Sequence, residues 1–525
     1  MKTTAKSTII KLLYSCKKCY TQSYLYFRKS DVIITRQNET PLFTALKEYA
    51  ANNPLQFHIP GHKKGVGIDP DFRAYIGDNA LAIDLINIAP LDDLHSPHGI
   101  IKDAEELAAA AFNADYTFFS VQGTSTAIMA MIMAVCYPGD KILVPRNVHK
   151  SILSGIIFAG ANPIFIHPEM DEKLGIAHGI TPHSVKRALE KHPDTKAILV
   201  INPTYYGIAA NLQAIVDVAH SYQIPVLVDE AHGAHINFNS RLPLSAMEAG
   251  ADMAATSLHK LGGSMTQSSI LNMRGSLVDP KRVQAVMSML TTTSTSYLLL
   301  ASIDVARRNL ATKGEQLLDT AINLSNHLRS HINLIPGLYC PGREILGTEA
   351  TFDLDDTKIL INVIELGITG YQAEQWLRDN YRIEVELSDL YNLLCIISLG
   401  DSEQSIEKLL TALQELSKAH NTNGKLNHIV VKLPEIPAIA LSPRDAFYSE
   451  TDKVPFRESS GHVIAEFITI YPPGIPVLLP GEVITQENID YILKNKAAGL
   501  PVQGSEDIEL KTVKVIKERK AISLY

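Results

Sequence analysis

Short apolar runs alternate with helix-like segments through much of the chain. The continuously apolar runs predict strands at residues 117–121, 141–145, 163–166, 197–201, 225–229 and 252–256. The segments between them predict helices at residues 124–136, from about 149, at 181–191 and at 211–222. Because strands that are apolar throughout and alternate with helices form parallel sheets covered on both faces, the pattern predicts an α/β fold.

Weaker patterns extend on either side of this region. A helix is expected at residues 40–51, and a long helical stretch covers about 278–310. Further helices are expected at 315–332 and 371–380, and strands at 358–363 and 393–398. These patterns divide the chain into an extension (1–36), a large domain with its N-terminal segment (37–310), a small α/β domain (311–420) and a C-terminal domain (421–525).

The first residues differ in composition from the rest. Up to Lys29 there are seven Lys or Arg residues and no Asp or Glu. Lys11, Lys17 and Lys18 interrupt the apolar core that a secretory signal needs. The extension is therefore read either as a disordered tail or as an organelle-targeting segment, and it is excluded from the fold.

Composition argues against several classes of protein. With 48 Lys and Arg against 56 Asp and Glu, the net charge of −8 argues against nucleic-acid binding. No apolar run approaches the roughly 18 residues that a membrane span needs. The five cysteines are scattered, and Cys16-x-x-Cys19 has no second pair, so we expect a reducing, cytoplasmic location without a zinc or disulfide framework.

The strongest candidate chemistry follows the strand at 252–256. Lys260 stands there between Ser257 and His259 and the small residues Gly262 and Gly263. A lysine at a strand end, where glycines let a ligand approach, suits a Schiff base with pyridoxal phosphate. Alone, Lys260 would more simply be a surface lysine after an edge strand.

An earlier strand, 225–229, ends on Asp229. A carboxylate here would keep the pyridine nitrogen of the cofactor protonated and its ring electron-poor. Ala231 is small enough for the ring to lie beside it. The sequence Asp229-Glu230-Ala231-His232 also occurs in helicases, but the chain has no Walker loop. Glu230, His232 and His235 would splay apart at a strand end, so no metal site is expected.

A phosphate site is predicted where the strand at 117–121 meets the next helix. Backbone N–H groups at a helix N-terminus, together with hydroxyls, bind phosphate. The residues that supply them are Gly123, Thr124, Ser125 and Thr126. Ser257 and His259 can complete the cradle from the other side, although an ordinary N-cap would look the same.

His149 begins a helix after the strand at 141–145. Its imidazole can stack on one face of the cofactor ring. A structural histidine at a helix N-terminus is the alternative.

Together these residues resemble the Orn/Lys/Arg decarboxylase family of pyridoxal-phosphate enzymes. The likeness extends from about Glu39 through Pro472-Pro473-Gly474-Ile475-Pro476 and Pro480-Gly481-Glu482. It is carried most specifically by the pair of motifs Ser257-x-His259-Lys260 and Asp229-x-Ala231-His232. Within the family, the chain is most similar to the shorter bacterial arginine decarboxylases.

The resemblance implies fold type I, with a mainly parallel seven-stranded sheet sandwiched by helices and smaller α/β and C-terminal domains. It implies that Lys260 carries the cofactor, that Asp229 meets the ring nitrogen and that His149 stacks on the ring. The catalytic set would be Lys260, His259, His149 and Asp229. The cofactor contacts would also include Ala231, His232, Gly123, Thr124, Ser125, Thr126 and Ser257.

The implied reaction is decarboxylation of arginine to agmatine and CO2, which supplies polyamine synthesis. Lysine or ornithine as substrate, an aminotransferase, and a non-catalytic cofactor-binding protein remain alternatives. Glu482 and Asp93 are candidates for reading the distal cation of the substrate. We also expect a homodimer or larger assembly, in which the hydroxyl run Thr291–Ser296 approaches the phosphate site of the other chain.

Overall fold

The computed structural model describes residues 36–420, 424, 433–470, 474–497 and 499–517. The N-terminal extension with Cys16 and Cys19, and Pro472 and Pro473, lie outside these ranges. Cys136, Cys340 and Cys395 are buried free thiols. None of the helices in the described ranges is both long and apolar enough to cross a membrane.

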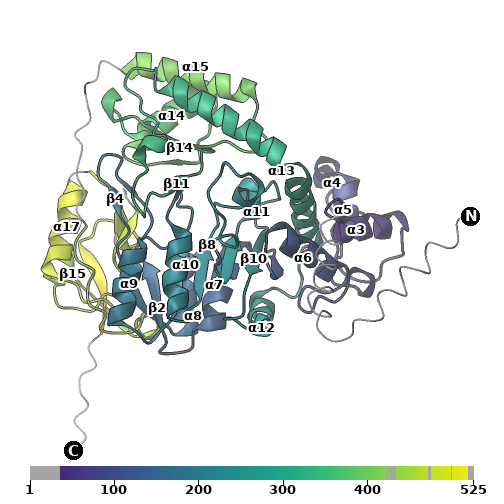
Figure 1. Ribbon diagram of the computed structural model, residues 1–525, viewed down its shortest axis with the longest axis horizontal. Helices are drawn as coiled ribbons and strands as arrows, with labels where there is room; N and C mark the ends of the chain where they lie inside the picture. Colours follow the sequence, from purple (N-terminus) through teal and green to yellow (C-terminus); the bar gives the residue numbers. More distant parts are fainter. Residues whose placement is uncertain (1–35, 421–423, 425–432, 471–473, 498, 518–525) are drawn as a thin grey trace, which may run out of the picture.

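A seven-stranded sheet forms the centre of the molecule (Figure 1), in the order β1-β10-β9-β8-β6-β2-β3. Its strands are β1 (Tyr116–Ser120), β2 (Lys141–Pro145), β3 (Asn162–Ile166), β6 (Thr195–Ile201), β8 (Val226–Asp229), β9 (Met253–Thr256) and β10 (Ser269–Met273). β10 runs opposite to the other six strands of this sheet, which all point the same way. The predicted α/β class with a mainly parallel sheet is confirmed.

The sequence did not predict β10, because polar residues interrupt its apolar pattern. These polar residues, Ser269 and Asn272, are buried, and each has a hydrogen bond to a neighbouring strand. Asn272 Oδ1 accepts from Thr117 Oγ1 at 2.7 Å, and Ser269 Oγ donates to the carbonyl of Thr256 at 2.7 Å. Partners on neighbouring strands thus satisfy the Asn272 oxygen and the Ser269 hydroxyl, whereas the buried Asn272 amide nitrogen has no partner in the described residues. Local sequence reveals none of these contacts.

Helices cover both faces of this sheet. One face packs against α7 (Gly123–Val135), α8 (Lys150–Ala159) and α12 (Pro280–Leu290), and the other against α9 (Pro182–Lys191) and α10 (Leu212–Ser221). Along β2, Ile142 and Val144 face the first cluster while Leu143 faces the second. This two-sided burial is why the strands read as continuous apolar runs, each buried aliphatic side chain contributing about 1.5–3 kcal/mol.

A second group of helices lies beside the edge strand β1. It contains α3 (Pro41–Ala51), α6 (Ile100–Ala111) and the 36-residue helix α13 (Tyr297–Ile332). Asp304 of α13 accepts from the backbone N–H groups of Leu42 and Phe43 at 3.1 and 3.2 Å. Asp304 also pairs with the buried Arg307 at 2.7 Å. The start of α3 is therefore fastened to α13 by charged groups.

The far half of α13 belongs to a smaller unit, seen at the top of Figure 1. This unit contains β12 (Lys358–Asn362), β13 (Leu387–Ser388), β14 (Asn392–Ile396), α14 (Gly370–Tyr381) and α15 (Glu403–His420). The expected boundary at residue 310 falls inside α13. A two-stranded ladder of β7 (Ile208–Ala209) and β11 (Asp353–Leu354) also joins this unit to the large sheet.

The C-terminal unit, yellow in Figure 1, packs against the end of the sheet at β3 and α8. Its elements are α16 (Pro443–Tyr448), β15 (Thr451–Pro455), β16 (Ile468–Ile470), β17 (Ile475–Leu478), α17 (Gln486–Ala497), β18 (Val502–Gln503) and β19 (Thr512–Ile516). Besides short 3-10 helices, the remaining elements in the described ranges are α4 (Pro70–Ile76), α5 (Asp78–Ile83), α11 (Leu258–Leu261), β4 (Met170–Asp171) and β5 (Ile176–Ala177).

Candidate active site

The predicted residues meet at one edge of the large sheet. Strands β1, β2, β8 and β9 point the same way, so the segments that follow them emerge together. Asp229 ends β8 and lies in register with Ala255 of β9. Lys260 follows β9 in the short helix α11, and His149 follows β2 as the N-cap of α8. Ligands of such sheets bind at this carboxyl edge.

Lys260 is half-buried and its amine contacts an imidazole. Its Nζ lies 2.8 Å from Nε2 of His232. Removal from water lowers the pKa of Lys260, although the charges of Asp229 and Glu386 oppose the shift. A lowered pKa increases the fraction of neutral amine, which is the nucleophilic form.

Asp229 is a buried carboxylate with one hydrogen bond. Its Oδ1 accepts from the backbone N–H of Ala231 at 3.2 Å, and its Oδ2 accepts none from the described residues. Burial raises the pKa of Asp229 to about 6, against the opposing charge of Lys260. A buried carboxylate with an unused oxygen fits a cationic ring nitrogen, as pyridoxal phosphate would supply.

The N-terminus of α7 provides donors for an anion. Gly123 has φ +77° and its N–H is used by the carbonyl of Gln267 at 2.8 Å. In the described ranges, the N–H groups of Thr124 and Ser125 have no acceptor. Such first-turn N–H groups are the ones that hold phosphate, so this end of the site also fits pyridoxal phosphate.

The hydroxyls at this helix divide into two kinds. Thr124 Oγ1 contacts the hydroxyls of Ser257 and Ser269, so it builds the buried wall. Thr126 Oγ1 turns back to the carbonyl of Gln122 at 3.3 Å. Among the three predicted hydroxyls, that of the exposed Ser125 is the one without a partner in the structure as described.

The two histidines that flank the site are held by backbone groups. His149 Nδ1 accepts from the N–H of Ser151 at 3.2 Å, which caps α8, and its ring is exposed at the site. Partial desolvation and the charge of Lys260 lower the pKa of His149, which favours a neutral ring. His259 Nδ1 lies 3.0 Å from the carbonyl of Ser268; since a carbonyl only accepts, Nδ1 carries a proton.

Three further residues reach the site without having been predicted. The Tyr205 ring lies 4.4 Å from the His232 ring, with the Lys260 amine 5.9 Å from its centre. The Tyr205 hydroxyl donates to Glu386 at 2.6 Å. Lys358 Nζ lies 3.3 Å from Nδ1 of His232. Glu386 and Lys358 come from the small unit, and no local pattern in the sequence places them here.

Glu482 and Asp93, the earlier candidates for the distal cation, have other partners. Glu482 is buried in a two-bond pair with Arg146, at 2.5 and 2.8 Å. Asp93 accepts from Asn87 at 3.2 Å and from the backbone of His95 at 3.0 Å. The Glu482 interpretation was therefore wrong, because its carboxylate is already neutralised inside the C-terminal interface.

The hydroxyl run begins near α7 of its own chain. The side-chain amide nitrogen of Gln122 donates to the carbonyl of Leu290 at 2.7 Å, and its oxygen accepts from the N–H of Thr292 at 3.0 Å. Thr295 is buried and its hydroxyl has no partner in the described ranges. The same ranges contain no cluster of three or more His, Cys, Asp or Glu side chains arranged to hold a metal ion.

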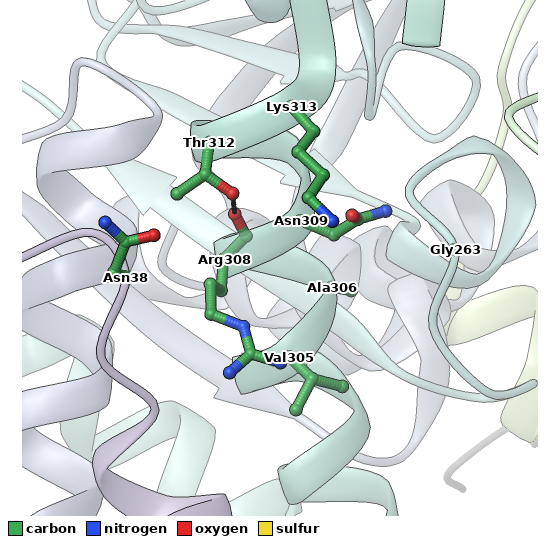
Figure 2. A pocket seen from close by; sticks show the side chains of 8 residues that line it. All are labelled: Asn38, Gly263, Val305, Ala306, Arg308, Asn309, Thr312 and Lys313. Atoms are coloured by element: carbon green, nitrogen blue, oxygen red, sulfur yellow. Dashed lines mark hydrogen bonds between the residues drawn. The ribbon is translucent and has the colours of Figure 1, made fainter.

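A separate hollow of about 470 Å³ lies along α13 (Figure 2). Gly263 forms part of its wall, whereas Arg308 and Lys313 place their cationic groups in it. No residue predicted for catalysis or cofactor binding lines it. The candidate chemistry is therefore at the sheet edge and not in this hollow.

Two family models match the chain. They are described as "Orn/Lys/Arg decarboxylase, major domain", over residues 40–405, and "Orn/Lys/Arg decarboxylase, C-terminal domain", over residues 426–506. The arginine decarboxylase of Bacillus anthracis is 66% identical over 488 residues, which is 93% of this chain and 99% of that protein. The arginine decarboxylase of Bacillus subtilis is 62% identical over 487 residues, 93% of this chain and 99% of that protein. A lysine decarboxylase structure from Francisella novicida aligns with a TM-score of 0.79 at 25% identity, covering 91% of this chain and 81% of that one.

Proposed function

Because the chain belongs to the Orn/Lys/Arg decarboxylase family of fold-type-I enzymes, we propose that it decarboxylates L-arginine to agmatine and CO2. The observation that carries the choice of arginine is the identity of 62–66% to arginine decarboxylases over 93% of the chain. Agmatine would then supply polyamine synthesis.

Pyridoxal phosphate is proposed as the cofactor, held covalently by Lys260. When bound, it supplies an electron-poor ring that accepts the electron pair left behind as CO2 departs. Support comes from the lowered pKa of Lys260, the unused oxygen of Asp229 and the free N–H groups of Thr124 and Ser125. The phosphate would take these N–H groups and the Ser125 hydroxyl.

The chain's own residues would then orient and protonate. With the cofactor bound, Asp229 would keep its ring nitrogen protonated, Ala231 would leave room for the ring, and His149 would cover the ring. Protonation at Cα would fall to Lys260 or His259, because both belong to the short helix α11 that follows β9 at the sheet edge. His259 keeps Nδ1 on the carbonyl of Ser268, so Nε2 is the nitrogen that would exchange a proton.

Glu386 is proposed as the residue that pairs with the guanidinium of the substrate. Its carboxylate is exposed and accepts from the Tyr205 hydroxyl. Its charge opposes the lowering of the pKa of Lys260 and of Lys358, so it lies near both amines. A guanidinium and a carboxylate form two parallel hydrogen bonds, which an ammonium cannot reproduce. Lysine or ornithine would bind the same carboxylate less specifically.

A cytoplasmic homodimer or larger assembly is the proposed form of the enzyme. A site at a sheet edge is open on one side, and a second copy would close it. Thr291–Ser296 starts beside α7, and Thr295 has a buried hydroxyl without a described partner. We propose that this run also reaches the phosphate site of the other copy. Mixing chains inactivated at Lys260 with chains inactivated in this run should restore part of the activity.

The function is tested by CO2 release from arginine, lysine and ornithine supplied separately with pyridoxal phosphate. We expect the largest kcat/KM for arginine and no release from the Lys260→Ala variant, which has lost the cofactor-bearing amine. Faster release from lysine or ornithine would overturn the substrate assignment. Ordinary turnover by Lys260→Ala would overturn the role of Lys260.

A further inference from the structure

Tyr205 lies between the candidate Schiff-base lysine and the carboxylate proposed for the substrate guanidinium. Its hydroxyl donates to Oε1 of Glu386 at 2.6 Å, and its ring centre lies 5.9 Å from the amine of Lys260. Lys260 follows β9 of the large sheet, whereas Glu386 immediately precedes β13 of the small unit. One side chain therefore contacts the group at the reacting end of a bound amino acid and the group proposed for its distal end.

The backbone that carries Tyr205 is a short turn held by its own hydrogen bonds. Thr204 donates its N–H to the carbonyl of Ile208 at 2.8 Å, and its hydroxyl accepts from the N–H of Ile208 at 3.1 Å. Gly207 has φ +87° and donates its N–H to the carbonyl of Thr204 at 3.0 Å. The ring of Tyr205 packs against that of His232, with the ring centres 4.4 Å apart. The position of the Tyr205 hydroxyl is therefore fixed by backbone and ring contacts.

Glu386, by contrast, depends on Tyr205 for its orientation. Its side chain is exposed, and among the described residues the Tyr205 hydroxyl is the group that donates to its carboxylate. An exposed glutamate without such a partner samples several rotamers, which weakens a ligand that needs one of them. A single hydrogen bond on Oε1 still leaves lone pairs on both oxygens. A guanidinium needs both oxygens, held in one plane, to form two parallel hydrogen bonds.

We propose that Tyr205 is a positioning residue that determines specificity, because it holds the Glu386 carboxylate at the distance from Lys260 that an arginine side chain spans. The inference rests on the proposed function, since it takes arginine as the substrate and Glu386 as the partner of its guanidinium. A longer side chain places the guanidinium beyond the carboxylate, and an ammonium uses only one of the two oxygens. Selection by length and by head group then both depend on the Tyr205 hydroxyl.

The first measurement needs no variant. Steady-state kinetics of the wild-type holoenzyme compare arginine with homoarginine, which carries the same guanidinium on a side chain one methylene longer. We expect kcat/KM to be about tenfold or more lower for homoarginine, because the extra methylene misplaces the guanidinium. Equal kcat/KM for the two amino acids would overturn the proposal. A larger kcat/KM for lysine or ornithine than for arginine would instead contradict the proposed function.

The second measurement uses Tyr205→Phe, which removes the hydroxyl and keeps the ring beside His232. We expect KM for arginine to rise about tenfold with a smaller effect on kcat, and the preference for arginine over homoarginine to fall by a similar factor. Tyr222→Phe is the matched control, since Tyr222 is exposed at the end of α10, and it should change neither value. Wild-type KM and preference in Tyr205→Phe would overturn the proposal and leave the proposed function intact.

A second background separates this role from an effect of Tyr205 on His232 or Lys260. In Glu386→Ala, the further change Tyr205→Phe should add nothing, because the carboxylate that the hydroxyl orients is gone. Calorimetric titration with agmatine, which keeps the guanidinium, should show the same pattern in Kd without turnover. An equal loss of affinity from Tyr205→Phe in both backgrounds would show that Tyr205 does not act through Glu386 and would overturn the proposal.

Discussion

The pair of Arg146 and Glu482 should be the most sensitive point of the C-terminal interface. Each is 1% exposed. The guanidinium donates two bonds to the carboxylate, at 2.5 and 2.8 Å, and one each to the carbonyls of Pro476 and Val477, at 2.9 and 3.1 Å. All four acceptors belong to the C-terminal unit, whereas Arg146 follows β2 of the large sheet.

Glu482→Gln leaves the guanidinium buried without a compensating charge. Breaking one side of a buried pair costs about 3–5 kcal/mol, because the remaining charge has lost its water and its counter-ion. Replacing both residues by methionine removes both charges, so the double variant should lose less stability than Glu482→Gln alone. The losses of stability caused by removing the two charges should therefore be strongly non-additive.

The assay is urea unfolding, followed in parallel by circular dichroism and by intrinsic fluorescence. Glu415→Gln is the matched control, since Glu415 makes a solvent-exposed pair with Lys418 and its loss should not move the transition measurably. A loss below about 1 kcal/mol in Glu482→Gln, or a double methionine variant less stable than Glu482→Gln, would refute this account of the pair.

Three other changes probe the site and the core. Asp229→Asn should fold but lower kcat by about 10²-fold, since a neutral amide no longer holds the ring nitrogen protonated; kinetics with saturating cofactor measure this, and near wild-type kcat would exclude the role. Glu386→Gln should raise KM for arginine about tenfold or more with a smaller effect on kcat, and an unchanged KM would remove Glu386 from the substrate site. Burial raises the pKa of Glu230 to about 8, above its usual value of 4.5, so its contribution to stability is complete below pH 4.5 and is lost as the pH rises through about 8. Glu230→Gln can still meet the N–H of Ala246 and the hydroxyl of Thr256, so its unfolding midpoint should depend less on pH over that window; an identical pH profile would contradict this.

The sequence predicted most of the large sheet because its strands are apolar on both faces and its helices have a clear period. It missed β10, where buried Asn272 and Ser269 look like solvent-facing positions until their cross-strand partners are known. The expected strand at 141–145 coincides with β2, since the whole run lies between two layers of helices.

The sequence likewise predicted some residues of the candidate site and missed others. Lys260 and Asp229 could be proposed from sequence because each stands at a strand end beside small residues, and the structure places both at one edge. Lys358 could not, because its segment reads as an ordinary strand and its partner is 126 residues away. The sequence wrongly suggested Glu482 as the residue that binds the distal cation. It shows the carboxylate but not that the guanidinium of Arg146 pairs with it.

Helix α13 makes the two larger units mechanically continuous. Its 36 residues form a rod of about 54 Å, fastened to α3 at one end and packed into the small unit at the other. Hinges form where loop residues can change their dihedral angles, and this connection has none. The helix thus holds the small unit at a fixed distance from the large sheet. Glu386 and Lys358 therefore keep constant positions at the sheet edge. We therefore expect substrate to enter by displacement of side chains and loops rather than by rotation of the whole small unit.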